Sequence, residues 1–267
     1  MQTKDQKKDY EVAVLDPAGN VTAIVLSDVP AAERAQVAAQ LLRLPELGIE
    51  QAAFLTEPRC GGEIRIEMMG GEFCGNALRC AGFYQALRTG VQGKTCVLAE
   101  ISGADGAQPV MADTAEGAAS TVMPLPLAVQ PAGWPDVQAA CVTFAGITHF
   151  VIDRALPDDA LVQRAVAAAP EADAVGAIFL DRAAGSIRPV VFVRETGSCV
   201  AETSCASGSA ATAVVLTADF ADGITEIGIG QPGGTLEVGV QRTGGAVTGL
   251  SIGGPVRLTK TITVTLP

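Results

Sequence analysis

The sequence predicts an α/β fold of the α+β kind, built from two matching domains in which a mixed sheet wraps around a central helix. Three observations lead to this prediction. The chain has 267 residues, enough for two domains that each bury a core. The same order of strand-like and helix-like segments occurs twice. Each series then leads into a helix that is apolar nearly all round, which is typical of a buried helix.

The first half contains strand-like segments and one amphipathic helix before its cysteine loop. A turn at 17–20 (Pro-Ala-Gly-Asn) separates the first two strands, because these are turn-forming residues. The helix is expected at 31–44, where apolar residues recur with a helical period. The strands are expected at 12–15, 21–26, 52–55 and 64–68.

The second half repeats this order. A helix is expected at 159–169, and strands are expected at 141–144, 148–152, 175–180 and 189–193. Each series ends in a loop of small residues that holds a cysteine, Cys74 in the first half and Cys205 in the second. The distance along the chain from helix to cysteine is nearly the same in both halves, which favours an internal repeat.

The central helix of each domain is expected directly after the cysteine, at 75–88 and at 206–218, where small and apolar residues dominate. A Pro-rich linker should separate the two domains. The N-terminal domain, the linker and the C-terminal domain are expected at 1–123, 124–135 and 136–258. The final strand-like segment, 259–267, is expected to return to the first domain.

Composition and charge narrow the range of functions. With 48% hydrophobic and 18% charged residues, the chain is neither disordered nor a coiled coil. The net charge of -11 argues against a nucleic acid or an anionic membrane as partner. A charged N-terminus and the lack of any apolar run of ~18 residues predict a cytoplasmic protein. The seven cysteines are expected as free thiols.

Several motif-like patterns are better explained by structure than by chemistry. Residues 88–95 resemble a phosphate-binding loop, but Arg88 stands where its first glycine belongs and a helix precedes it, so a turn is expected. The single histidine, His149, gives little basis for a zincin or a serine triad. A zinc site is disfavoured because no cysteine pair has CxxC-type spacing, and Cys80 is expected in the core.

Cys74 and Cys205 each precede a helix, where free N–H groups and the positive end of the helix dipole favour an anion. A single cysteine in such a place is most simply a small residue near a helix cap. Two in matching positions predict a pair in which one thiolate removes a proton from a carbon and one thiol delivers a proton to its opposite face. The expected product is the mirror-image stereocentre.

At these residues the sequence resembles a known family. The segment 73–80 (FCGNALRC) closely resembles the first motif of the diaminopimelate epimerase superfamily, and 202–208 (ETSCASG) resembles the second. Further matching segments follow in family order at 16–22, 48–55, 146–151 and 231–236. The resemblance implies two pseudo-symmetric diaminopimelate-epimerase-like domains with the active site in the cleft between them. It also implies a two-cysteine racemase or epimerase that uses no cofactor and no metal.

Departures from the family pattern indicate a subgroup. Diaminopimelate epimerases hold the far end of their long substrate with polar side chains, whereas the corresponding positions here are Met68, Ile147 and Thr196. A pocket without those hydrogen-bonding groups binds that polar end poorly. The stretch 189–208 instead resembles the histidine racemases of opine metallophore pathways, although Ala206 replaces the glycine that is usual after the second cysteine.

The resemblance, carried over residue by residue, implies a catalytic pair and a set of substrate contacts. The catalytic pair is Cys74 and Cys205. The substrate contacts are Asn20, Gln51, Gly75, Asn76, His149, Glu202, Ala206 and Ser207. Simpler roles stay open for two of them: His149 as a satisfied strand histidine and Glu202 as a helix cap.

The predicted function is a cofactor-independent racemase of a free amino acid, histidine first and other polar or basic amino acids next. The alternatives are a diaminopimelate epimerase proper, another isomerase of the superfamily, and a non-catalytic small-molecule binding protein. The expected partner is the amino-acid substrate, and a homodimer is compatible with the sequence. Glu50, Glu72 and Glu195 either favour a cationic substrate or are simply solvated.

Overall fold

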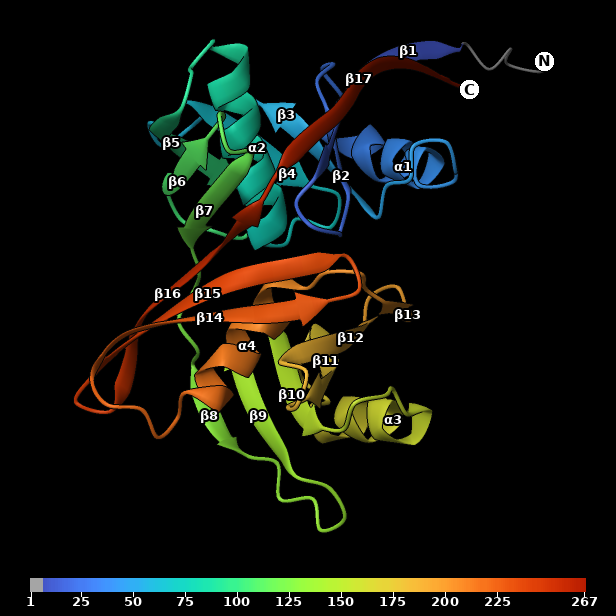
Figure 1. Cartoon of the computed structure of the whole chain (residues 1–267). Helices are drawn as coiled ribbons and strands as arrows, with labels where there is room; N and C mark the ends of the chain where they lie inside the picture. The colour runs from blue at the N-terminus through green and yellow to red at the C-terminus, as the bar shows by residue number, and fades with distance from the viewer. Residues whose placement is uncertain (1–6) are drawn as a thin grey trace, which may run out of the picture. The chain divides into compact units, whose positions relative to one another are not determined.

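The structure, a computed structural model, describes residues 7–267, and the chain divides into two units (Figure 1). Unit 1 runs to Thr121 and includes Pro255–Pro267, and unit 2 covers Val122–Gly254. Each unit has a mixed sheet, one peripheral helix and one central helix. No helix among the described residues is both long enough and apolar enough to cross a membrane.

The sheet of unit 1 has the strand order β17-β1-β2-β3-β4-β5-β6-β7, in which β2–β3 and β4–β5 are parallel and the other pairs antiparallel. The central helix α2 (Gly75–Arg88) packs against β2, β4, β5 and β6, and α1 (Ala31–Leu41) packs against β3. The strands are β1 Lys8–Asp16, β2 Thr22–Val25, β3 Gln51–Thr56, β4 Ile64–Met68, β5 Lys94–Ile101, β6 Gln108–Asp113, β7 Ala118–Val122 and β17 Arg257–Leu266.

Unit 2 repeats this pattern with the order β8-β9-β10-β11-β12-β14-β15-β16, in which β10–β11 and β12–β14 are parallel. The short strand β13 adds a hairpin to β12. The central helix α4 (Ala206–Leu216) packs against β10, β11, β14 and β15, and α3 (Asp159–Ala168) packs against β11. The strands are β8 Ala128–Pro131, β9 Ala139–Phe144, β10 Ile147–Asp153, β11 Ala174–Asp181, β12 Ser186–Val193, β13 Ser198–Ala201, β14 Gly223–Gln231, β15 Gly234–Thr243 and β16 Ala246–Pro255.

The two sheets therefore share one topology, down to which neighbouring strands are parallel, and the expected fold class is confirmed. The repeat extends to the outermost strands, because β17 pairs with β1 as β8 pairs with β9. The segment 124–135, expected as a linker, thus contains a strand of unit 2. The segment expected to return to the first domain forms β17 of unit 1.

Small residues allow the central helix of unit 1 to lie close to its sheet. A methyl group at Gly82 of α2 would lie 2.5 Å from Cβ of Val110 on β6, so only glycine fits there. Cys80, on α2, lies in the core, as expected, and burial raises the pKa of its thiol to about 12. After Arg88 the chain turns through Gly90 and Gly93, both with positive φ, so the segment 88–95 is the expected turn.

A buried carboxylate holds one loop of unit 1 to the sheet. The side chain of Glu100, on β5, is fully buried. It accepts hydrogen bonds of 2.6–3.1 Å from the backbone N–H groups of Arg59, Cys60 and Gly62 and from the Arg65 guanidinium. Burial raises the pKa of this carboxyl, but the four donors outweigh it and hold the pKa at about 2.

Acidification is expected to weaken unit 1 through Glu100. Because the folded pKa lies below the unfolded value, the stabilisation is complete above about pH 5 and is lost as the pH falls toward about 2. Chemical denaturation at several pH values measures this loss. Glu100→Gln should show a smaller loss over the same range, whereas Glu57→Gln, at an exposed carboxylate, should follow the unmodified protein. Parallel curves for Glu100→Gln and the unmodified protein would contradict this assignment.

Candidate active site

The two cysteines occupy the same position at the start of the two central helices. Cys74 is the N-cap of α2 (φ -135°, ψ 112°), and its sulfur accepts the N–H of Ala77 at 3.5 Å. Cys205 is the N-cap of α4 (φ -121°, ψ 108°), and its sulfur accepts the N–H of Gly208 at 3.4 Å. A sulfur thus takes the place of the usual Ser or Asp oxygen, at the helix end that stabilises an anion.

In unit 1, an amide oxygen faces the cysteine. Oε1 of Gln51 lies 3.4 Å from Sγ of Cys74. The orientation of this amide is fixed because the Thr22 hydroxyl donates to a backbone carbonyl at 3.1 Å and must therefore accept from Nε2 of Gln51, at 2.8 Å. An amide oxygen can only accept, so the contact favours Cys74 as a thiol that donates its S–H.

The turn at 16–20 carries the next predicted residue. Ala18, Gly19 and Asn20 all have positive φ, of 70°, 87° and 54°. Such conformations are costly for residues other than glycine and persist where the surroundings fix them. Here the carboxylate of Asp16 accepts the N–H of Gly19, and the carbonyl of Asn20 accepts from Thr22 and, at 3.5 Å, from Gln51. The turn therefore belongs to the Cys74 half-site.

A buried arginine ties the first motif to the rest of unit 1. Arg79 is fully buried on α2, and burial lowers its pKa to about 10, so it is still a cation at neutral pH. It donates to Oδ1 of Asn76 at 3.1 Å, and the same guanidinium donates to the carbonyls of Pro17, Ala119 and Pro255. Asn76, the second residue after the cysteine, is thereby held by the side chain of Arg79.

In unit 2, Cys205 lies among a carboxylate, a hydroxyl and a backbone donor. Burial raises the pKa of its thiol, and the charge of Glu202 and a hydrogen bond to that carboxylate raise it further. The N–H of Gly208 and the hydroxyl of Ser207, 3.7 Å from Sγ, act in the opposite direction. Oε1 of Gln231 accepts the N–H of Cys205 at 2.6 Å and fixes the backbone there.

His149 reaches the same group of residues from the sheet. It is fully buried on β10, and its Nε2 lies 2.8 Å from the Ser207 hydroxyl oxygen. The ring also makes an edge contact with Phe144. One nitrogen of His149 therefore contacts a side chain in the first turn of α4.

The structure gathers the predicted residues into two half-sites, one in each unit. The Cys74 half-site holds Asn20, Gln51, Cys74, Gly75 and Asn76, and the Cys205 half-site holds His149, Glu202, Cys205, Ala206 and Ser207. Gly75 and Ala206 are the first helical residues, so their N–H groups have no acceptor within the helix.

The other positions named in the sequence analysis differ in burial and in partners. Oε1 of Glu50 accepts the N–H of Val21 at 3.3 Å, and Glu72 and Glu195 are exposed. Met68 is buried in the core of unit 1, Ile147 is half-buried, and Thr196 is exposed. Thr196 hydrogen-bonds to the Ser198 hydroxyl within its own turn.

Three residues that shape the half-sites were not expected from the sequence: Thr22, Arg79 and Gln231. Each lies inside a segment that carried the family resemblance, at 16–22, 73–80 and 231–236. A signal was therefore present, but the contacts that give these side chains their roles join residues far apart in the chain and are visible only in the fold.

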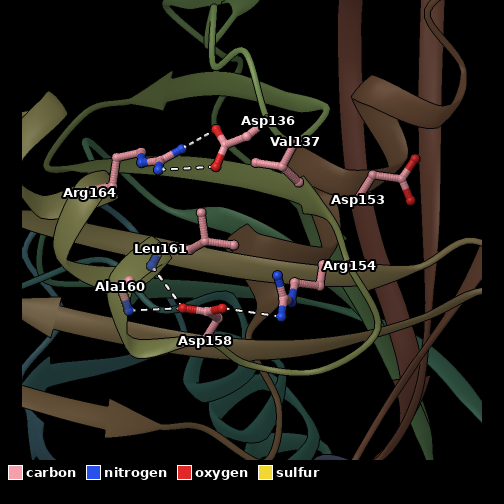
Figure 2. A pocket seen from close by; sticks show the side chains of 8 residues that line it. All are labelled: Asp136, Val137, Asp153, Arg154, Asp158, Ala160, Leu161 and Arg164. Atoms are coloured by element: carbon pink, nitrogen blue, oxygen red, sulfur yellow. Dashed lines mark hydrogen bonds and ion pairs between the residues drawn. The ribbon is translucent and has the colours of Figure 1, made fainter.

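A surface hollow elsewhere in unit 2 is lined by charged side chains, four of which pair with one another (Figure 2), while the fifth, Asp153, pairs with Arg182 outside it. Arg164 contacts Asp136 at 2.6 Å, and Arg154 contacts Asp158 at 3.2 Å. No residue of either half-site lines it. The ion pairs account for its charges, so the hollow is not a candidate catalytic site. Among residues 7–267, no group of three or more His, Cys, Asp and Glu side chains is placed to hold a metal ion.

Comparison with known proteins gives one family and several relatives. The family model described as "Histidine racemase CntK N-terminal domain" matches residues 11–264. The histidine racemase of Fusobacterium nucleatum subsp. nucleatum is 28% identical over 252 residues, which are 86% of this chain and 90% of that protein. The histidine racemase of Staphylococcus aureus is 25% identical over 253 residues, 87% of this chain and 89% of that protein.

The fold has close counterparts among solved structures. The Bacillus anthracis phenazine biosynthesis protein of the PhzF family has a TM-score of 0.69 at 14% identity, over 97% of this chain and 100% of that chain. At that identity the likeness concerns the fold alone. The resemblance drawn from the cysteine motifs is confirmed by the family match and by the two racemases.

Proposed function

We propose that the chain inverts free histidine, with Cys74 and Cys205 as its acid and base. The premise is that the chain belongs to the histidine racemase CntK N-terminal domain family and is an isomerase that racemises an amino acid. One observation carries the proposal: the same cap geometry recurs around both cysteines in two units of the same topology. The non-catalytic alternative does not agree with membership of an isomerase family.

The chemistry needs one thiolate and one thiol on opposite faces of the α-carbon. In one direction, the Cys205 thiolate takes the α-proton while the thiol of Cys74 delivers its proton to the other face; the reverse reaction exchanges the roles. Each sulfur accepts one backbone N–H, from Ala77 or Gly208, but their side-chain neighbours differ: an amide oxygen of Gln51 at Cys74, and the Glu202 carboxylate and the Ser207 hydroxyl at Cys205.

Removing the α-proton leaves negative charge next to the substrate carboxylate. The N–H groups of Gly75 and Ala206, the first residues of α2 and α4, are donors available for that charge. Ala206 donates through its backbone, so the missing glycine does not remove the donor. The Glu202 carboxylate would face the substrate ammonium group or hold the Cys205 proton.

Histidine is proposed as the substrate because of the family, and because the positions that would bind the far end of a longer substrate lack hydrogen-bonding groups for it. Met68 is buried among apolar side chains and has no group that could bind a second ammonium or carboxylate. Thr196 uses its hydroxyl within its own turn. A polar far end of a long substrate would therefore lose hydration without gaining partners.

Histidine is expected to be racemised with a kcat/KM at least ~100-fold above that for LL-diaminopimelate, the scale expected when a site lacks hydrogen-bonding partners for a polar group. Chiral chromatography of both reactions under the same reducing conditions measures the ratio. The kcat/KM values for other basic and polar amino acids should fall between those for histidine and LL-diaminopimelate. A preference for diaminopimelate would overturn the substrate assignment and would favour a diaminopimelate epimerase.

A further inference from the structure

The single histidine of the chain, His149, is connected to the second cysteine, Cys205, through the side chain of Ser207. His149 is fully buried, and its Nε2 lies 2.8 Å from the hydroxyl oxygen of Ser207. The same hydroxyl oxygen lies 3.7 Å from Sγ of Cys205. The three side chains therefore form a continuous series of polar contacts from the buried imidazole to the thiol.

The other ring nitrogen is enclosed. Among residues 7–267, Nδ1 of His149 has no hydrogen-bond partner. It faces Gly176, the residue that pairs with His149 on β11, and a methyl group on that glycine would overlap with Nδ1. Space that excludes a methyl group also excludes a water molecule. Burial lowers the pKa of His149 to about 3, so the ring is neutral at physiological pH.

A neutral imidazole has one N–H donor and one acceptor nitrogen. A buried N–H without an acceptor is rarer than an unfilled acceptor, so the enclosed Nδ1 is the acceptor and Nε2 carries the hydrogen. Nε2 of His149 then donates to the Ser207 oxygen, and the Ser207 hydrogen must point to another acceptor. Sγ of Cys205 is within its reach.

We propose that His149 is a positioning residue for Cys205: it fixes the Ser207 hydroxyl so that its hydrogen points to Sγ and stabilises the thiolate. The Ser207 hydroxyl matters because the negative charge of the Glu202 carboxylate disfavours a thiolate at Cys205, and a hydrogen bond from Ser207 offsets part of that effect. The N–H of Gly208 also donates to the sulfur, at 3.4 Å.

The arrangement belongs to one cysteine of the pair. In unit 1, the second residue after the cysteine is Asn76, and Arg79 holds its side-chain oxygen. In unit 2, the second residue after the cysteine is Ser207, and His149 holds it. The repeat thus keeps the backbone of the two half-sites and changes the partner of the equivalent side chain.

The test is the pH dependence of alkylation of Cys205 by iodoacetamide, read by mass spectrometry of its peptide. The role of His149 in catalysis rests on the proposed function, but this titration needs no turnover. His149→Asn should raise the midpoint of Cys205 alkylation by about one pH unit, as expected when a thiolate loses one hydrogen-bond donor. His149→Gln, whose longer amide places an N–H near the position of Nε2, should restore most of the original midpoint.

Further variants separate this role from a structural one. Ser207→Ala should raise the midpoint as much as His149→Asn, and the double variant should raise it no further, because both changes remove the same donor. The exposed Cys199 is the internal reference, and its midpoint should stay constant. Equal shifts for His149→Asn and His149→Gln, or additive shifts in the double variant, would overturn the proposal. Normal titrations with no racemisation would instead count against the proposed function.

Discussion

Replacing either Cys74 or Cys205 with alanine is expected to lower the rate of racemisation by about 10⁴-fold or more. Inversion needs a proton acceptor on one face of the α-carbon and a proton donor on the other, so each variant lacks one half of the reaction. The decay of the circular dichroism of L-histidine measures the rate. Both variants should keep the fold, because alanine loses one sulfur atom and one cap contact.

The chain offers matched controls for these variants. Cys199→Ala and Cys96→Ala remove exposed thiols outside both half-sites and should leave the rate unchanged. Cys74→Ser and Cys205→Ser should keep only traces of activity, because a hydroxyl ionises at a much higher pH than a thiol. Turnover near that of the unmodified protein in either alanine variant would show that the pair does not act as acid and base.

Arg79→Leu is expected to lower the free energy of unfolding by about 3 kcal/mol or more, because it leaves several buried oxygens without their donor. These acceptors are Oδ1 of Asn76 and the carbonyls of Pro17, Ala119 and Pro255. Urea unfolding measures the loss, and the slope of the unfolding free energy against urea concentration should stay unchanged.

Arg88→Leu is the control for Arg79, because Arg88 lies on the same helix and is exposed, and its guanidinium donates to Oε1 of Gln85 on that helix. Its expected effect is within about 0.5 kcal/mol. Arg79→Lys should recover little, because an ammonium group cannot reach acceptors spread around a planar guanidinium. Equal stabilities for Arg79→Leu and Arg88→Leu would contradict the role of the buried arginine.

The sequence predicted well the elements whose burial is strong and local. The helix at 75–88 and the strand at 64–68 have the expected bounds, because a buried face and turn residues mark their ends. The helix expected at 31–44 ends at Leu41, and Pro45 follows a short turn. The strands β14 to β16 were not expected, because their glycines and exposed polar residues interrupt the apolar pattern.

The sequence predicted which residues belong to the candidate site, but not which contacts they make. Cys74 and Cys205 precede helices in the sequence, and the structure makes both of them N-caps. Gln51 was expected to touch substrate, but its amide oxygen lies against Cys74 and its nitrogen against Thr22. That arrangement depends on the parallel pairing of β2 with β3, which sequence patterns do not specify.

The two half-sites are alike in backbone and different in side chains. The amide oxygen of Gln51 faces Cys74, whereas both the Glu202 carboxylate and the Ser207 hydroxyl face Cys205. The two thiols should therefore differ in acidity. We expect kcat and KM for L- and D-histidine to depend differently on pH, while kcat/KM stays equal for the two enantiomers because their equilibrium ratio is one.

The most direct test of the two-cysteine account is proton NMR of L-histidine incubated with the protein in D₂O. With two separate bases, the D-histidine formed early should carry deuterium at Cα, while the remaining L-histidine keeps its protium. Deuterium entering L-histidine as fast as D-histidine appears, or D-histidine that retains protium, would contradict the account and indicate a single base.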